Sequence, residues 1–355
     1  MSPQQRFLLL LILVGAEVIL LAFVPGLVFE AALTLDLPEL RRRLLPVGLL
    51  ATAGVAATVL LIGTLTHLLL GFSWASGMLL GAILAATDPI AVVTLLRQLK
   101  APSGLAAILE GESLLNDGTG VAVFSAVLAT ILAGAPSFGG AAVRFVEIGV
   151  GGAVIGLAVG FLGVALMRAA EDAPLEILAT LVIAYGSYLA ADIVHASGIV
   201  AVVAAGVVIA RYGSTTGKLR GTQLIGFWNL LAFVLNAILF ILVGAALPAS
   251  KLLPVAGLVI AAFVIMLVTR AVPVYGLLTA VDWGAISIPW PWRHLTFWAG
   301  LRGALSVALA LSVADLTQVD KRVSIVAYGV VLLSLLIQGG LIAPVARALR
   351  IERIA

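Results

Sequence analysis

The chain has 355 residues, of which 63% are hydrophobic and only 10% are charged. An average soluble domain carries roughly 25% charged residues, so this composition excludes a soluble protein and predicts an all-α, polytopic membrane protein. The net charge is only +3, and the basic residues stand in short clusters between apolar runs, which argues against a nucleic-acid partner. There is no cysteine, so disulfides and thiolate metal sites are excluded.

Eleven apolar segments, each near the ~20 residues that a membrane-spanning helix needs, follow one another along the chain. Their approximate ranges are 7–34, 45–70, 74–98, 104–134, 142–167, 174–193, 197–211, 222–247, 253–280, 294–313 and 322–348. Short polar loops separate them, so residues 1–355 are predicted to form a single integral membrane domain. The first run follows Arg6 like a signal peptide, which remains the alternative, but no small-x-small cleavage site comes after it.

Lysines and arginines gather in the loops that follow odd-numbered segments, as at Arg41–Arg43. By the positive-inside rule these loops face the cytoplasm. With eleven spans the N-terminus then lies outside and the C-terminus in the cytoplasm, and the expected location is the inner membrane of a bacterium. Glu30 follows a Pro-Gly break in the first segment and is assigned to the cytoplasmic interface beside the arginine cluster. A second intramembrane acid is the alternative.

The third segment holds Thr87, Asp88 and Pro89 in its middle. Proline has no N–H to donate and disfavours helical geometry at the residue before it, so the helix is predicted to break here. Broken helices at membrane depth are the usual construction of ion sites in secondary transporters. A proline kink with Asp88 capping the second half-helix explains the same residues equally well.

The fourth segment opens with EGESLLNDGTG at 110–120. Ser113 and Asp117 stand four residues apart, as do Glu112 and Asn116, so on a helix each pair shares one side. Burial disfavours the charged form of Asp117, so that protons and cations compete for it. The alternative is that Asn-Asp-Gly forms a loop, but apolar residues flank the tripeptide closely.

Oxygen atoms from Asp117, Ser113 and Thr87 would suit a hard monovalent or small divalent cation. Asn116 is uncharged and holds geometry without adding a second titrating group.

Arg302 is a lone arginine inside the tenth segment and needs a carboxylate partner. We predict that Glu112 is this partner; the alternative has Arg302 snorkelling to a membrane surface. Arg270 equally fits an anchor at the inner interface. In the last segment, Gly339 and Gly340 are predicted to interrupt a helix as Pro89 does, which would give the two broken helices of an inverted-repeat transporter.

Five motifs follow one another along the chain: VFEAAL at 28–33, TDP at 87–89, EGESLLNDGT at 110–119, GLRGALSVALAL at 300–311 and SLLIQGGLIAPVAR at 334–347. Together they resemble the monovalent cation:proton antiporter family of the NhaP and NHE type, from about residue 20 to 350. The resemblance implies an inverted-repeat antiporter fold with two broken helices crossing at mid-membrane. It also implies a mobile core of about 74–134 and 294–348 beside a scaffold that forms a homodimer, and elevator-type exchange of Na⁺ or K⁺ for H⁺ without a cofactor.

The resemblance also implies roles for single residues. It makes Asp117 the cation- and proton-binding carboxylate, with Asn116 as its neighbour and with Thr87 and Ser113 at ligand positions. It makes Asp88 the acid of the broken helix. It also pairs Glu112 with Arg302 and matches Glu30 to a further acidic position. Asn-Asp at 116–117 implies electroneutral exchange.

In one respect the sequence departs from this family, whose members carry about thirteen spans, two more ahead of VFEAAL than are found here. A truncated, non-transporting cation-binding membrane protein is therefore an alternative, as is a K⁺-selective exchanger or channel-like pore. An enzyme is not expected, because three histidines without cysteine leave little for a catalytic constellation and no Walker-type loop is present.

Overall fold

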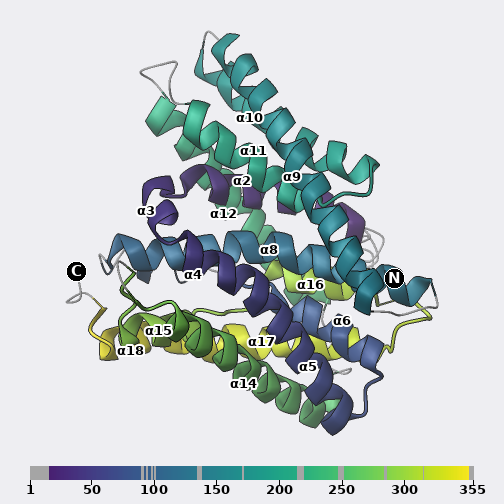
Figure 1. Cartoon of the computed structure of the whole chain (residues 1–355). Coiled ribbons are helices and arrows are strands. Elements are labelled where there is room, and N and C mark those ends of the chain that lie inside the picture. Colours follow the sequence, from purple (N-terminus) through teal and green to yellow (C-terminus); the bar gives the residue numbers. More distant parts are fainter. Residues whose placement is uncertain are drawn as a thin grey trace. The chain divides into compact units, whose positions relative to one another are not determined.

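The computed structural model describes residues 16–88, 92, 95–96, 99, 101–133, 138–169, 172–213, 220–246, 252–283, 286–314 and 316–351. Throughout these ranges the regular structure is helical and no residue lies in a β-strand, which confirms the all-α fold class (Figure 1). The chain divides into two compact units, one made of Met1–Leu35 with Gly139–Ala246 and the other of Asp36–Phe138 with Leu247–Ala355.

The described residues of the first unit form five long helices. They are α2 (Ala16–Thr34), α9 (Phe138–Ala169), α10 (Ala173–Ile193), α11 (Gly198–Tyr212) and α12 (Arg220–Ala246). Helix α2 packs against α10, α11 and α12, and its Phe29 ring lies 4.8 Å from the fully buried ring of Trp228. Contrary to the predicted Pro-Gly break, α2 continues through Pro25 as one helix. Membrane helices tolerate proline because neighbouring groups can satisfy the freed carbonyl.

The second unit begins with α3 (Leu37–Arg42) and a long helix made of α4 (Leu44–Leu49), the π-helical turn η1 (Leu50–Gly54) and α5 (Val55–Leu70). Gly71, with φ +67°, ends α5 in the left-handed conformation that favours glycine. Ser73 then caps α6 (Trp74–Ala85) by accepting the Ser76 N–H at 3.1 Å. Helices α5 and α6 pack closely, because Gly81 has no Cβ to strike the Val59 carbonyl.

The described residues of the second unit also form α8 (Ser103–Leu132), η3 (Leu253–Val255), α14 (Ala256–Ala280), α15 (Trp290–Trp298), α16 (Ala304–Ser312), α17 (Arg322–Leu333), the π-helical turn η4 (Ser334–Gln338) and α18 (Gly339–Ala348). Helix α8 is unbroken across Asn116, Asp117 and Gly118, so the alternative of an Asn-Asp-Gly loop is wrong. Within this helix Asn116 donates to a carbonyl at the end of α6, a contact between distant segments that the local tripeptide rule does not include.

Two helical segments are interrupted within the described residues of this unit. Helix α6 ends at Ala85, and residues 86–88 are not helical, as the TDP motif predicts; Pro89 itself lies outside the described residues. The second interruption is at 299–303, between α15 and α16. The prediction of a break at Gly339 and Gly340 is wrong, because the chain continues from α17 through η4 into α18. Glycine lowers helix stability by only about 1 kcal/mol, which surrounding packing can offset.

Each of the eleven predicted apolar segments overlaps at least one described helix. Among the described residues, seven helices are long and apolar enough to cross a membrane, and three shorter apolar helices accompany them, by length and composition only. A multi-pass membrane protein is therefore supported, while the number of eleven spans stays a prediction.

Candidate functional site

The two interrupted segments meet inside the second unit. The Asp88 N–H donates to the Leu301 carbonyl at 2.8 Å, so unwound backbone from one segment satisfies unwound backbone from the other. Gly303 makes this approach possible, because a Cβ at that position would overlap the Asp88 side chain. The crossing therefore brings the TDP motif and the GLRG motif, which are more than two hundred residues apart, to one point.

Arg302 lies at this crossing and faces the end of α6. Its Nη1 donates to the carbonyls of Ala85 and Ala86 at 3.0 and 3.2 Å, and the side chain is fully buried. The carbonyls at a helix C-terminus carry partial negative charge, which a cation stabilises. Arg302 thus neutralises the end of a half-helix inside the fold, and the alternative of snorkelling to a surface is wrong.

Glu112 pairs with a different arginine from the one predicted. Arg270 on α14 forms a two-pronged ion pair with it, in which Nη2 lies 3.0 Å from Oε2 and Nη1 contacts Oε1. Both residues are buried, with exposed fractions of 2% for Glu112 and 6% for Arg270. The predicted ion pair between Glu112 and Arg302 is therefore wrong, as is an interface anchor at Arg270. Arg302 instead donates to the carbonyls at the end of α6.

Helix α8 supplies two polar side chains that hold the unwound TDP stretch. The Ser113 hydroxyl donates to the Thr87 carbonyl. The Asn116 amide donates to the Ala85 carbonyl at 2.9 Å and, at 3.4 Å, to the Thr87 hydroxyl. Ser113, Asn116 and Thr87 are all buried. Three of the residues assigned to the site are thereby brought together by direct contacts.

Asp117 lies on α8 one turn beyond Ser113 and is half-buried. Within the part of the chain that the structure describes, it forms no ion pair, and its Oδ1 atom is buried without a hydrogen-bond partner. The Oδ1 atom of Asn116 is likewise buried without a hydrogen-bond partner among the described residues. A buried carboxylate oxygen with no donor costs free energy unless a proton or cation satisfies it. The oxygen atoms of Asp117, Ser113 and Thr87 are ligands of the type that a small hard cation prefers.

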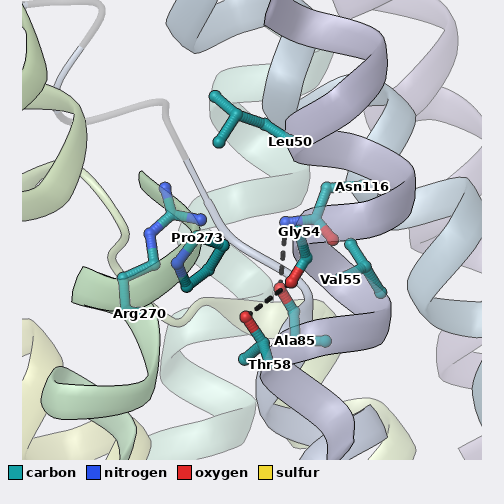
Figure 2. Close-up of a pocket in the computed structure, with 8 residues that line it drawn as sticks. All are labelled: Leu50, Gly54, Val55, Thr58, Ala85, Asn116, Arg270 and Pro273. Atoms are coloured by element: carbon teal, nitrogen blue, oxygen red, sulfur yellow. Dashed lines mark hydrogen bonds between the residues drawn. The ribbon is translucent and has the colours of Figure 1, made fainter. Parts of the chain in front are cut away.

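A small pocket lies on one side of this arrangement, and Figure 2 shows Arg270 and Pro273 on one side of it and Asn116 and Val55 on the other. Leu50, Gly54, Thr58 and Ala85 complete the lining. The pocket holds about 10 Å³, close to the least volume that accommodates one water. The space beside Asn116 is therefore too small for a hydrated cation in this conformation.

The remaining assigned residues are Asp88 and Glu30. Asp88 lies in the crossing itself and is half-buried. Glu30 lies on α2 in the first unit and is also half-buried; its carbonyl accepts the Thr34 hydroxyl at 3.0 Å. The interfacial role of Glu30 stays a prediction.

Sequence reasoning missed three residues of this region, Arg270 as the partner of Glu112, and Ser334 and Gln338 near Arg302. A signal for Arg270 was present, because an arginine in the middle of an apolar segment calls for a partner. Ser334 and Gln338 carry a weaker signal, as polar side chains in an otherwise apolar helix.

Two glycine substitutions test where the second interruption lies. Gly303 has φ −115°, which other residues adopt freely, so Gly303→Ala acts through its contact with Asp88. We expect it to destabilise the protein by about 1–3 kcal/mol, as overpacking does. Gly340→Ala meets nothing within 4 Å and should be neutral or slightly stabilising. Thermal unfolding of the purified variants measures both, and the reverse order would place the interruption at Gly339 and Gly340.

The model of the transmembrane sodium/hydrogen exchanger family matches residues 7–348. The chain belongs to this family. The Na(+)/H(+) antiporter ApNhaP of Aphanothece halophytica is 37% identical over 345 residues, which is 93% of this chain and 64% of that protein. The Na(+)/H(+) antiporter NhaP of Pseudomonas aeruginosa is 37% identical over 347 residues, covering 94% and 81%. The chain thus spans less than two thirds of the length of the Aphanothece relative.

The sodium proton antiporter MjNhaP1 of Methanocaldococcus jannaschii has a similar structure, with a TM-score of 0.80. The match covers 98% of this chain and 92% of that one at 19% sequence identity, so it supports the fold alone. The resemblance drawn from the five motifs is confirmed at the level of family and of fold.

Proposed function

We propose that this protein exchanges a monovalent cation, Na⁺ or K⁺, for H⁺ across a membrane, with Asp117 as the carboxylate that both ions share. The observation that carries the proposal is the buried Oδ1 of Asp117, which has no partner among the described residues and lies on the face of α8 that holds Thr87. The family and the named Na(+)/H(+) antiporters among its relatives support the same reaction.

The neighbouring charges leave Asp117 as the group that exchanges. Glu112 is paired with Arg270, and Nη1 of Arg302 donates to the carbonyls at the end of α6. Asn116 holds the TDP backbone and adds no charge. When the cation binds, the Asp117 carboxyl releases its proton, and oxygens of Thr87 and Ser113 complete the coordination. When the cation leaves, a proton takes its place.

This competition couples the two fluxes. An Asp117 carboxylate carrying neither ion is an uncompensated charge, which is costly to move through a membrane. Only the loaded forms then cross. One carboxylate binds one cation or one proton, so exchange is electroneutral and Asn116 adds no second proton.

The moving part in this proposal is built on the helices of about 74–134 and 294–348, to which the buried pair of Glu112 and Arg270 also joins α14. The remaining helices form the scaffold and homodimer side. The movement is elevator-like. The N-terminus lies outside and the C-terminus in the cytoplasm of a bacterial inner membrane. Thiol-labelling of single cysteines introduced into the cysteine-free chain at either terminus tests this orientation.

Exchange in proteoliposomes tests the proposed function. Purified protein is reconstituted with an internal pH indicator, and Na⁺, K⁺, Li⁺ or choline is added outside under an imposed pH gradient. We expect Na⁺ or K⁺, but not choline, to drive proton movement. The Na⁺-driven rate should be unchanged when valinomycin, with equal K⁺ on both sides, clamps the membrane potential. Cation binding without any flux would instead indicate a non-transporting binding protein, and conduction far above transporter rates a channel.

A further inference from the structure

The π-helical turn η4 joins α17 to α18 and carries two polar side chains, Ser334 and Gln338. Both are fully buried. A π-helical turn within an α-helix is rare and occurs frequently at functional sites. A buried glutamine in a membrane helix is costly, and the Nε2 of Gln338 is buried without a hydrogen-bond partner among the described residues. Packing alone would be better served by an apolar residue, so the pair calls for another explanation.

The Ser334 hydroxyl connects this turn to the unwound stretch of 299–303. It donates its single proton to Gln338 Oε1 at 2.7 Å. It accepts the backbone N–H of Arg302 at 3.0 Å. Because the hydroxyl donates its hydrogen bond to Gln338, it presents a lone pair to the Arg302 N–H. Gln338 thereby fixes the rotation of the hydroxyl. The N–H of Arg302, which lies outside a helix, gains a partner that its own segment does not supply.

From Arg302 the chain of contacts continues to the candidate cation ligands. The guanidinium of Arg302 binds the carbonyls of Ala85 and Ala86, and the neighbouring Leu301 carbonyl accepts the Asp88 N–H. These contacts hold the residues on both sides of Thr87. The orientation of the Thr87 oxygens therefore depends on the backbone that Ser334 fixes.

We propose that Ser334 and Gln338 are positioning residues for the cation site. They hold the 299–303 backbone, and through Arg302 they hold the TDP stretch in the geometry that binds the cation. The inference rests on the proposed function, because it names how that site is kept in shape. Neither residue touches the transported ion; both act through Arg302.

Na⁺ binding to the full-length protein in detergent tests this inference. The shift in melting temperature is followed as NaCl replaces choline chloride at constant ionic strength, which gives an apparent Kd for Na⁺. Ser334→Ala should raise this Kd by about three- to tenfold, the range in which residues coupled to a site act. Gln338→Met, which keeps Ser334 but frees its hydroxyl to rotate, should shift the Kd in the same direction by less. Ser334→Thr keeps a hydroxyl and should restore binding.

A matched control is available on the same segment. Ser324 on α17 is buried, and its hydroxyl has no partner among the described residues, so Ser324→Ala should leave the Kd unchanged. If Ser334→Ala does not fold, Gln338→Met tests the same claim.

The pH profile of exchange separates positioning from a general loss of stability. Because Na⁺ and H⁺ compete, weaker Na⁺ binding at a fixed, high Na⁺ concentration lets protons prevail at a lower proton concentration. The acid limb of activity in Ser334→Ala should therefore move to higher pH, by up to about one unit for a tenfold change in Kd. A lower rate with an unshifted profile would overturn the inference.

The two proposals can fail separately. If the unmodified protein exchanges Na⁺ and both Ser334→Ala and Gln338→Met bind Na⁺ as Ser324→Ala does, the positioning role is wrong and the proposed function stands. If the unmodified protein neither binds nor exchanges a cation, both proposals fail.

Discussion

Asp117→Asn is expected to abolish cation:proton exchange in proteoliposomes, down to the background of protein-free vesicles. The substitution keeps the size of the side chain but removes the only group in the proposed mechanism that carries a proton or balances a cation. The local hydrogen bonds from Ser113 and Asn116 to the TDP stretch do not involve Asp117, so the helix packing should persist. The amide is uncharged, so it removes the cost of a carboxylate oxygen that is buried without a donor, and thermal stability should be retained or raised.

The control for Asp117→Asn is a carboxylate that lies outside the site. Glu147 on α9 is exposed and forms a surface ion pair with Arg144 at 3.6 Å. Glu147→Gln should exchange normally, because exposed pairs contribute at most about 1 kcal/mol. Both variants are reconstituted at matched protein content. Normal exchange by a well-folded Asp117→Asn would show that another group carries the proton.

The second large effect is expected when the buried pair between Glu112 and Arg270 is broken. Glu112→Gln leaves the Arg270 charge uncompensated in a buried position, which costs about 3–5 kcal/mol of stability. Exchange should fall with it, because Glu112 lies on the same helix as Asp117 and fixes α8 against α14. Thermal and denaturant unfolding of the purified variants measure the loss.

A double-mutant cycle decides which arginine is the partner of Glu112. Glu112→Gln combined with Arg270→Gln removes both charges together, so the double variant should be more stable than the sum of the single losses predicts. Arg302→Gln instead replaces the charged donor to the carbonyls at the end of α6 with a weaker, neutral one. The coupling energy of its cycle with Glu112→Gln should be smaller than that of the cycle with Arg270→Gln. The opposite ranking of the two couplings would restore the pairing of Glu112 with Arg302.

Local sequence rules were sufficient for part of the site. The proline after Asp88 predicts the end of α6. The four-residue spacing in EGESLLNDGT predicts that Ser113 shares a side of the helix with Asp117 and that Glu112 shares one with Asn116, and α8 is helical across all four. Both inferences depend only on neighbouring residues. A break caused by proline, or a helix face set by spacing, needs no knowledge of what packs against it.

The parts that were predicted wrongly depend on contacts between distant segments. Glu112 lies within reach of Arg270 because α14 approaches α8, and no spacing in the chain reveals which of two intramembrane arginines arrives there. The interruption at 299–303 carries no proline and is held open by partners from elsewhere, namely Asp88 and Ser334. Gly339 and Gly340 looked more suited to a break, yet helical packing continues through them.

The most direct test of the central claim is the number of protons released when the cation binds. Purified protein in weakly buffered detergent solution, at a pH where the site is protonated, is titrated with Na⁺ against choline while a pH indicator records released protons. The account predicts one proton released for each Na⁺ bound, and neither binding nor release in Asp117→Asn. Na⁺ binding without proton release would contradict a carboxylate shared by the two ions.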